Sequence, residues 1–128
     1  MQSFTSEKQN AVVLVIDDDP EVRNVVSTTL NRVGLETAEA ASGRAALDWL
    51  AAHPLPDLVL LDIWMPDTDG VTLLKEWSTG GLLNMPVIMM SGHATIDTAV
   101  DAIRIGAQAF LEKPITLQKL LKTVEQGL

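Results

Sequence analysis

Apolar residues recur along the chain in short blocks with two alternating spacings. Residues 11–16 form an uninterrupted β-rich run, which is typical of a strand. The run ends at an acidic stretch in which Asp19 is a suitable N-cap and Pro20 a suitable first helical residue. Apolar residues then follow at helical spacing until Gly34, namely Val22, Val25, Val26, Leu30 and Val33. The pattern predicts a strand followed by a helix.

The same alternation of strand and helix continues to the last residue. We expect further strands at residues 35–40, 57–62, 85–90 and 107–111, and further helices at 44–52, 71–78, 95–105 and 116–126. The strands at 57–62 and 85–90 are apolar on both faces, as in parallel strands covered on both sides. The sequence therefore predicts a single doubly wound α/β domain over residues 11–128, after a disordered or tag-like leader at 1–10.

Composition narrows the class of protein. The chain has 128 residues, a formal net charge of -8 and no cysteine. This length suits one domain, and the acidic balance argues against binding of a nucleic-acid backbone. Without cysteine there is no disulfide and no thiolate nucleophile. Neither a membrane-spanning run nor a secretion signal is present in the sequence, so we expect a cytoplasmic protein.

Residues whose side chains can take part in catalysis or metal binding follow the predicted strands. Asp17 and Asp18 come after the first strand, Asp62 ends the third, Ser91 follows the fourth and Lys113 follows the fifth. In an open parallel sheet, the ligand crevice lies beyond the carboxyl ends of the strands. We therefore expect three carboxylates, a hydroxyl and an ammonium group to converge there.

Such a group of side chains suits phosphoryl chemistry. Carboxylates held close together repel one another, and a hard cation such as Mg²⁺ relieves that repulsion. A carboxylate also serves as a nucleophile toward a phosphoryl group, which gives an aspartyl phosphate. Lys113 and the Ser91 hydroxyl would then bind the phosphoryl oxygens.

Four short motifs contain these residues: VIDDDP, DLVLLDIWMPDTDG, MMSGH and FLEKPI. With them, residues 12–124 resemble the receiver domains of bacterial two-component response regulators. The resemblance implies the flavodoxin-like (βα)5 fold with sheet order 2-1-3-4-5. It further implies that Asp62 is the phosphoacceptor, and that Asp18, Asp62 and the backbone carbonyl of Trp64 bind Mg²⁺ directly. Asp17 would bind the ion mainly through a water molecule.

The resemblance also implies a switch. Ser91 and Phe110 would form it, although the family more often has tyrosine where this chain has Phe110. The peptide bond between Lys113 and Pro114 is expected to be cis. Phosphorylation would shift the surface formed by residues 95–105, 107–111 and 116–126, which is the expected contact for an output domain or for a homodimer. The domain would accept its phosphoryl group from a sensor histidine kinase and catalyse only its own phosphotransfer and slow autodephosphorylation.

Within the family, residues 91–121 are most similar to receivers of nitrogen-regulation-type activators that work with the alternative sigma factor. Those proteins carry an AAA+ ATPase and a DNA-binding domain. Neither is in this sequence, so it is expected to be an excised receiver or one that acts alone, and the final helix favours excision.

Several residues keep two interpretations. Trp64 and His93 either control access of water to the phosphate or are ordinary surface residues. Asp67 and Asp69 are turn formers rather than metal ligands. Two alternative functions also stay open: a metal-dependent phosphatase or phosphotransferase, and a binding module that is never phosphorylated.

Overall fold

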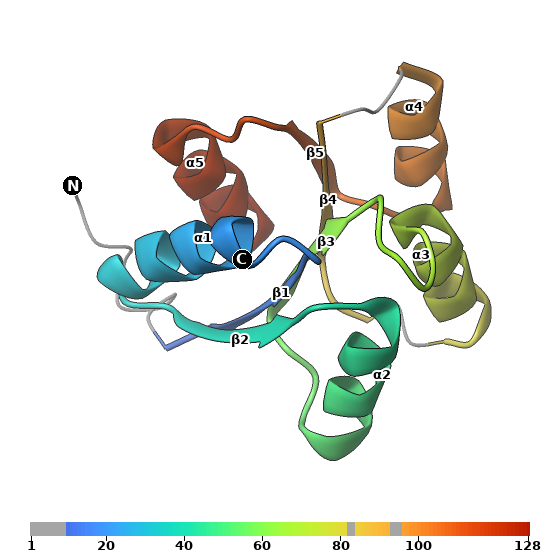
Figure 1. Ribbon diagram of the computed structural model, residues 1–128, viewed down its shortest axis with the longest axis horizontal. Coiled ribbons are helices and arrows are strands. Elements are labelled where there is room, and N and C mark those ends of the chain that lie inside the picture. Colours follow the sequence, from blue (N-terminus) through green and yellow to red (C-terminus); the bar gives the residue numbers. More distant parts are fainter. Residues whose placement is uncertain (1–9, 82–83, 93–95) are drawn as a thin grey trace.

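The computed structural model describes residues 10–81, 84–92 and 96–128, in which strands and helices alternate (Figure 1). The strands are β1 (Val12–Ile16), β2 (Glu36–Ala40), β3 (Leu58–Asp62), β4 (Val87–Ser91) and β5 (Ala109–Glu112). The helices are α1 (Pro20–Arg32), α2 (Gly43–Ala52), α3 (Gly70–Thr79), α4 (Ile96–Ile105) and α5 (Leu117–Gly127). The expected doubly wound architecture is confirmed.

The strands form one parallel sheet in the order β2-β1-β3-β4-β5. This is the order that the family resemblance implied. The chain moves outward from β1 to β2 and then returns across β1 to β3, so the strand order reverses between β1 and β3. A crevice opens at such a reversal because the connections leave the two strands toward opposite sides.

Helices cover both faces of the sheet (Figure 1). Val13 and Val15 of β1 belong to the core under α1 and α5, whereas Leu14 and Ile16 belong to the core under α2, α3 and α4. All four side chains are completely buried. Because successive strand residues point to opposite faces, a strand buried on both sides must be apolar throughout.

Side chains before α1 and α3 fix where these helices begin. Asp19 accepts a hydrogen bond from the backbone N–H of Glu21 at 2.9 Å, and Pro20 is the first residue of α1, as expected. Asp69 caps α3 by accepting from Thr72 N at 2.7 Å. Asp69 is therefore a helix cap as well as a turn residue.

Each strand begins later than expected, and β4 and β5 begin two residues later because of their hydrogen bonding. β4 begins at Val87 because Pro86 has no N–H, although its carbonyl still accepts from Val59 N at 2.9 Å. β5 begins at Ala109 because the N–H of Ala107 donates to Ala102 O at 2.9 Å and so completes the end of α4. Ser91, expected just after its strand, is the last residue of β4.

The expected leader lies outside the described residues, apart from Asn10, whose N–H donates to Gly34 O at 2.9 Å. Among the described helices, none is long and apolar enough to cross a membrane.

Truncation of a core residue will test the two-sided burial. Leu60, at the centre of β3, is 0% exposed. Leu60→Ala is expected to lower the free energy of unfolding by about 2–5 kcal/mol, because it removes buried apolar contacts and leaves a cavity. Val25→Ala is the control, since Val25 is 56% exposed and its truncation should change stability by less than about 0.5 kcal/mol. Urea unfolding measures both, and equal losses would contradict the assignment of the core.

Candidate functional site

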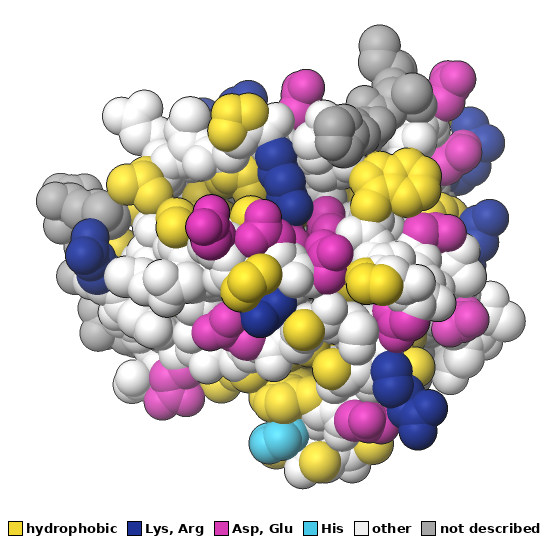
Figure 2. Space-filling model, in the orientation of Figure 1, with side chains coloured by type: hydrophobic (Ala, Val, Ile, Leu, Met, Phe, Trp, Pro, Cys, Tyr) yellow, Lys and Arg dark blue, Asp and Glu magenta, His cyan; other side chains and the backbone are white. Residues whose placement is uncertain are grey.

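The carboxyl ends of the strands bring the predicted polar residues together. Asp17 directly follows β1, Asp62 ends β3, Ser91 ends β4 and Lys113 directly follows β5. Figure 2 shows acidic side chains gathered in the middle of this face, next to a basic side chain. Because the strands are parallel, residues far apart in the chain meet at one edge.

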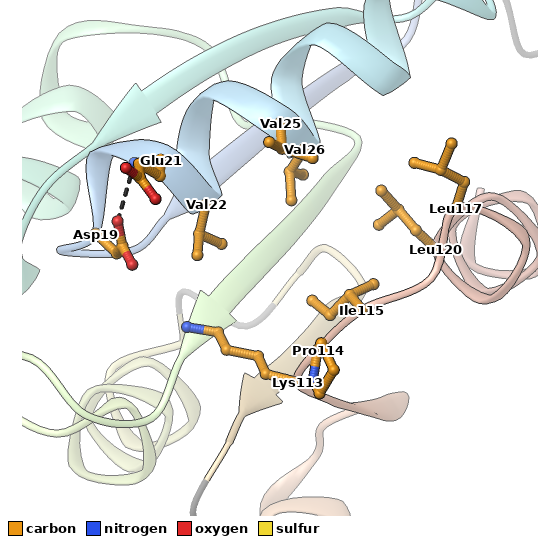
Figure 3. A pocket seen from close by; sticks show the side chains of 10 residues that line it. All are labelled: Asp19, Glu21, Val22, Val25, Val26, Lys113, Pro114, Ile115, Leu117 and Leu120. Atoms are coloured by element: carbon orange, nitrogen blue, oxygen red, sulfur yellow. Dashed lines mark hydrogen bonds between the residues drawn. The ribbon is translucent and has the colours of Figure 1, made fainter.

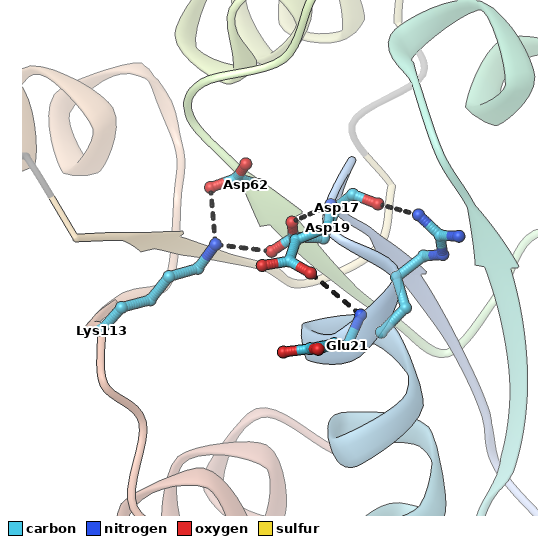
Figure 4. Close-up of polar contacts among 6 residues, drawn as sticks. Asp17, Asp19, Glu21, Asp62 and Lys113 are labelled. Carbon is cyan, nitrogen blue, oxygen red and sulfur yellow. Dashed lines mark hydrogen bonds and ion pairs between the residues drawn. The ribbon is translucent and has the colours of Figure 1, made fainter.

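Lys113 joins two of the carboxylates (Figure 4). Its Nζ lies 2.7 Å from Asp17 Oδ2 and 3.3 Å from Asp62 Oδ1. Asp17 is 0% exposed and Asp62 4%, so both charges are held almost out of water. Removal of the ammonium group would leave them unpaired, and an unpaired buried charge is costly.

The pKa values follow from this arrangement. Burial, followed by the negative charge of Asp17, raises the pKa of Asp62 to about 6, and these effects outweigh the lowering by Lys113. Burial opposes the charged form of Lys113, yet its hydrogen bonds and ion pairs with Asp17 and Asp62 raise the pKa of Lys113 overall. At neutral pH the site therefore holds an ionised Asp62 facing a cationic lysine.

The carboxylates also fit a hard divalent cation. Oxygen atoms of Asp17, Asp18 and Asp62 all lie within 4.8 Å of one another. Asp18 is exposed, so the group opens to solvent on one side. Three carboxylates against one ammonium group leave excess negative charge, and an all-oxygen donor set is the kind that Mg²⁺ prefers. The residues present therefore fit the predicted magnesium ion.

Trp64 lies at the edge of the same open hollow. Its side chain is 54% exposed, and it lines the hollow together with Asp18, Asp62, Gly92 and Lys113. The role of its backbone carbonyl as a metal ligand stays a prediction. His93, the other residue expected near the phosphate, lies outside the described residues.

A neighbouring arginine holds the acidic loop in place. Arg23 Nη1 donates to the backbone carbonyl of Asp17 at 2.6 Å, and Arg23 Nε lies 3.3 Å from Glu39 Oε1 on β2. The N–H of Asp19 also donates to Asp17 Oδ1 at 2.9 Å. Sequence reasoning missed Arg23, because nothing in the local pattern distinguishes it from a solvent-facing arginine on α1.

The two predicted switch residues lie on adjacent strands. Ser91 is completely buried, and its carbonyl accepts from Lys113 N at 2.9 Å. Phe110 pairs with Met89 in the sheet register and is half-buried against the core under α3 and α4. The bond between Lys113 and Pro114 is cis, as expected.

Asp67 and Asp69 do not belong to the acidic group that the described residues form. Asp69 caps α3, and Asp67 accepts hydrogen bonds from the start of α2. The preference for a structural role over metal binding agrees with these contacts.

An apolar groove adjoins the acidic hollow (Figure 3). It is a cavity of about 260 Å³ between α1 and the segment that leads into α5. Val22 and Val25 line one side, Ile115 and Leu117 line the other, and Lys113 lines both the groove and the acidic hollow. The sequence pattern placed Val25 on the apolar face of α1, but it is 56% exposed along this groove. The groove was not predicted, because it depends on how α1 and α5 lie side by side.

Comparisons with known proteins agree on one family. Residues 13–125 match the response regulator receiver domain family. The chain is 41% identical over 116 residues to the regulatory protein AtoC of Escherichia coli, covering 91% of this chain and 25% of AtoC. It is 36% identical over 120 residues to the DNA-binding transcriptional regulator NtrC of the same organism, covering 94% of this chain and 25% of NtrC. The chain thus spans about a quarter of the length of these relatives.

Solved structures agree with this similarity. The receiver domain of NtrX from Brucella abortus superposes with a TM-score of 0.83 at 40% identity, covering 91% of this chain and 97% of that one. The Vibrio cholerae chemotaxis protein CheY4 gives a TM-score of 0.83 at 30% identity, covering 92% and 98%.

The raised pKa of Asp62 predicts how stability changes with pH. The folded state keeps the proton of Asp62 up to about pH 6, whereas the unfolded chain releases it near 3.8. Folding therefore binds a proton in this range, and its contribution to stability falls as pH rises from about 4 to 6. In the presence of a metal chelator, Asp62→Asn is expected to be more stable than the wild type at pH 7 by roughly 1–3 kcal/mol. The substitution removes the free-energy cost of ionising the buried Asp62 carboxyl group.

Urea unfolding at several pH values measures this effect. Asp101→Asn, at an exposed position on α4, is the control and should follow the wild-type curve. A less stable Asp62→Asn protein at pH 7 would show that the ionised carboxylate stabilises the fold.

Proposed function

The chain belongs to the response regulator receiver domain family of two-component signalling systems, and we propose that it is a switch operated by phosphorylation of Asp62. One observation carries this proposal: Asp62 is a buried carboxylate held between Lys113 and two further aspartates at the carboxyl edge of the sheet. The phosphoryl donor is a phosphohistidine of a sensor histidine kinase.

The transfer is a displacement at phosphorus. An oxygen of Asp62 forms a bond to phosphorus while the bond from phosphorus to the donor imidazole nitrogen breaks, and that electron pair stays on the imidazole. With its pKa raised to about 6, Asp62 is ionised and nucleophilic at neutral pH. Lys113 places positive charge beside the incoming phosphoryl oxygens.

Mg²⁺ is the proposed cofactor. Asp18, Asp62 and the backbone carbonyl of Trp64 would hold it directly, and Asp17 mainly through a water molecule. The ion supplies positive charge that offsets both the three carboxylates and the phosphoryl oxygens. Trp64 and His93 are proposed to limit the access of water to the phosphate, and the exposed ring of Trp64 at the hollow supports this for Trp64. The domain then catalyses only its own phosphorylation and slow dephosphorylation.

Phosphorylation changes the charge balance around Lys113. A phosphoryl group adds roughly -1.5 to -2 charge at neutral pH, so Lys113 and the Ser91 hydroxyl are drawn toward Asp62. Phe110 responds on the adjacent strand, and the surface of α4, β5 and α5 shifts between two states. Val100 and Ile103 on α4 are each 47% exposed, which supports a contact at this surface.

The partners at the α4-β5-α5 surface are output domains of the same protein or a second receiver in a homodimer. NtrC is by name a DNA-binding transcriptional regulator, and the chain covers only 25% of it. With the resemblance to nitrogen-regulation-type activators, this supports a proposed context that includes an AAA+ ATPase, a DNA-binding domain and the alternative sigma factor. The receiver itself makes no contact with nucleic acid or membrane, and we place it in the cytoplasm.

The kinase is proposed to lie over the apolar groove between α1 and α5. Lys113 and Asp19 line both this groove and the acidic hollow. A protein that brings a phosphohistidine to Asp62 therefore covers the groove at the same time. Exposed Val25 and Leu117, at 56% and 46%, offer it apolar contact area.

Phosphorylation with acetyl phosphate tests the chemistry directly. The wild type is expected to gain about 80 Da, the mass of one phosphoryl group, only when Mg²⁺ is present. Asp62→Asn should gain nothing, because its amide is not a nucleophile. Intact-mass spectrometry measures the adduct, and beryllium fluoride provides a stable mimic if the phosphate is short-lived. Failure of the wild type with both reagents would favour a binding module that is never phosphorylated.

Substitution in the groove tests the kinase surface. Val25→Asp places a charge among apolar side chains and is expected to slow transfer about tenfold from an autophosphorylated kinase that phosphorylates the wild type. Labelling by acetyl phosphate should be unchanged, because this small donor needs no groove. Val100→Asp on α4 is the matched control and should accept phosphate from the kinase at the normal rate. Equal slowing of both variants would contradict docking at the groove.

A further inference from the structure

The loop at residues 63–69 connects the phosphoacceptor to α3. Two backbone hydrogen bonds hold its ends: Ile63 N donates to Met90 O at 3.0 Å, and Gly70 N donates to Ile63 O at 2.6 Å. Trp64, the proposed carbonyl ligand, lies inside this loop with its ring 54% exposed. Packing of the Trp64 ring therefore contributes little to the position of the Trp64 carbonyl.

A carboxylate farther along the loop fastens it to α2. Asp67 Oδ1 accepts from Gly43 N at 3.1 Å, and Asp67 Oδ2 accepts from Arg44 N at 2.9 Å. The next N–H of the helix, that of Ala45, donates to the Ser42 hydroxyl at 3.1 Å. The start of α2 is thus capped partly by its own chain and partly by a loop more than twenty residues away.

Both side-chain oxygens of Asp67 take part in this contact, although the residue itself is exposed. The hydrogen bonds from Arg44 and Gly43 lower the pKa of Asp67 below its usual value, because they favour its ionised form. The positive end of the α2 dipole also favours a carboxylate. Helix and loop are in close contact, since a Cβ added at Gly43 would collide with the Thr68 side chain and lie 3.6 Å from both Asp67 oxygens.

The other side of the loop is equally confined. A Cβ added at Gly70 would meet the backbone of Asp62 and Ile63. The loop is therefore fitted between the start of α2 and the end of β3, and Asp67 is its side-chain contact with α2.

We propose that Asp67 is a positioning residue that holds the β3–α3 loop in register for Mg²⁺ binding and phosphoryl transfer at Asp62. This inference rests on the proposed function, since it assigns Asp67 a role at that site. Asp67 touches neither the ion nor the phosphoryl group, and it acts through the backbone between itself and Trp64. Residues that orient metal ligands in this way commonly change metal affinity when they are removed.

A helix cap that only adds stability would behave differently, and Ser42 provides the matched control. Ser42→Ala removes one cap from the same end of α2 but leaves the loop attached. Asp67→Ala removes the attachment itself. Asp67→Asn keeps one side-chain oxygen that accepts a single hydrogen bond, so it should keep part of the attachment. It also provides a second test in case Asp67→Ala does not fold.

The experiment compares these proteins with the wild type in three measurements. Titration with MgCl₂ by calorimetry gives the dissociation constant, acetyl phosphate at saturating Mg²⁺ gives the phosphorylation rate, and ¹⁵N relaxation gives the order of the Trp64 amide. We expect Asp67→Ala to bind Mg²⁺ about tenfold more weakly and to show a more mobile Trp64 amide. The Mg²⁺ dissociation constant of Ser42→Ala should stay within about twofold of the wild-type value. This should hold even if its midpoint of urea unfolding falls as much as that of Asp67→Ala.

The results distinguish failure of the positioning role from failure of the proposed function. Wild-type Mg²⁺ affinity in Asp67→Ala, or an equal loss in Ser42→Ala, overturns the positioning role. If the wild type neither binds Mg²⁺ nor takes up phosphate, the proposed function fails instead. In that case the mobility of the Trp64 amide still reports whether Asp67 holds the loop.

Discussion

Two carboxylates buried at the carboxyl edge of the sheet share one ammonium group, and the rest of the structure maintains that arrangement. Asp17 and Asp62 are almost completely removed from water, and Lys113 reaches both. Like charges held this close repel each other, so a rigid frame is needed to keep them in place. The parallel sheet is that frame, because β1, β3 and β5 each deliver one of these residues from an apolar core.

Hydrogen bonds and an ion pair around the site also hold the segments that contain Asp17 and Asp62. Arg23 fixes the backbone of Asp17 and reaches Glu39 on β2. Asp67 links the loop that leaves Asp62 to the start of α2 through two hydrogen bonds. Both contacts join a site segment to a helix or strand that carries no site residue. The position of the site therefore depends on elements on both faces of the sheet.

Much of the fold and of the site could be predicted from the sequence, because the spacing of apolar residues and the ends of strands can be recognised in short stretches of sequence. Asp17, Asp62 and Lys113 were predicted to meet, since parallel strands place their carboxyl ends at one edge. Val25 shows where the pattern fails: helical spacing reports an apolar face of α1, but not whether α5 lies close enough to bury it. The contacts of Arg23 and Asp67 also escaped, because each joins residues brought together only by the finished fold.

The shared wall between the acidic hollow and the apolar groove has a thermodynamic consequence. Asp19, Lys113 and Pro114 line both, so a change of charge at Asp62 and a protein bound over the groove act on the same residues. If charge at Asp62 alters the affinity for that protein by some factor, the bound protein alters the stability of the charged state by the same factor. In the proposed function, release of the phosphoryl donor and retention of the phosphoryl group are therefore governed by the same coupling free energy.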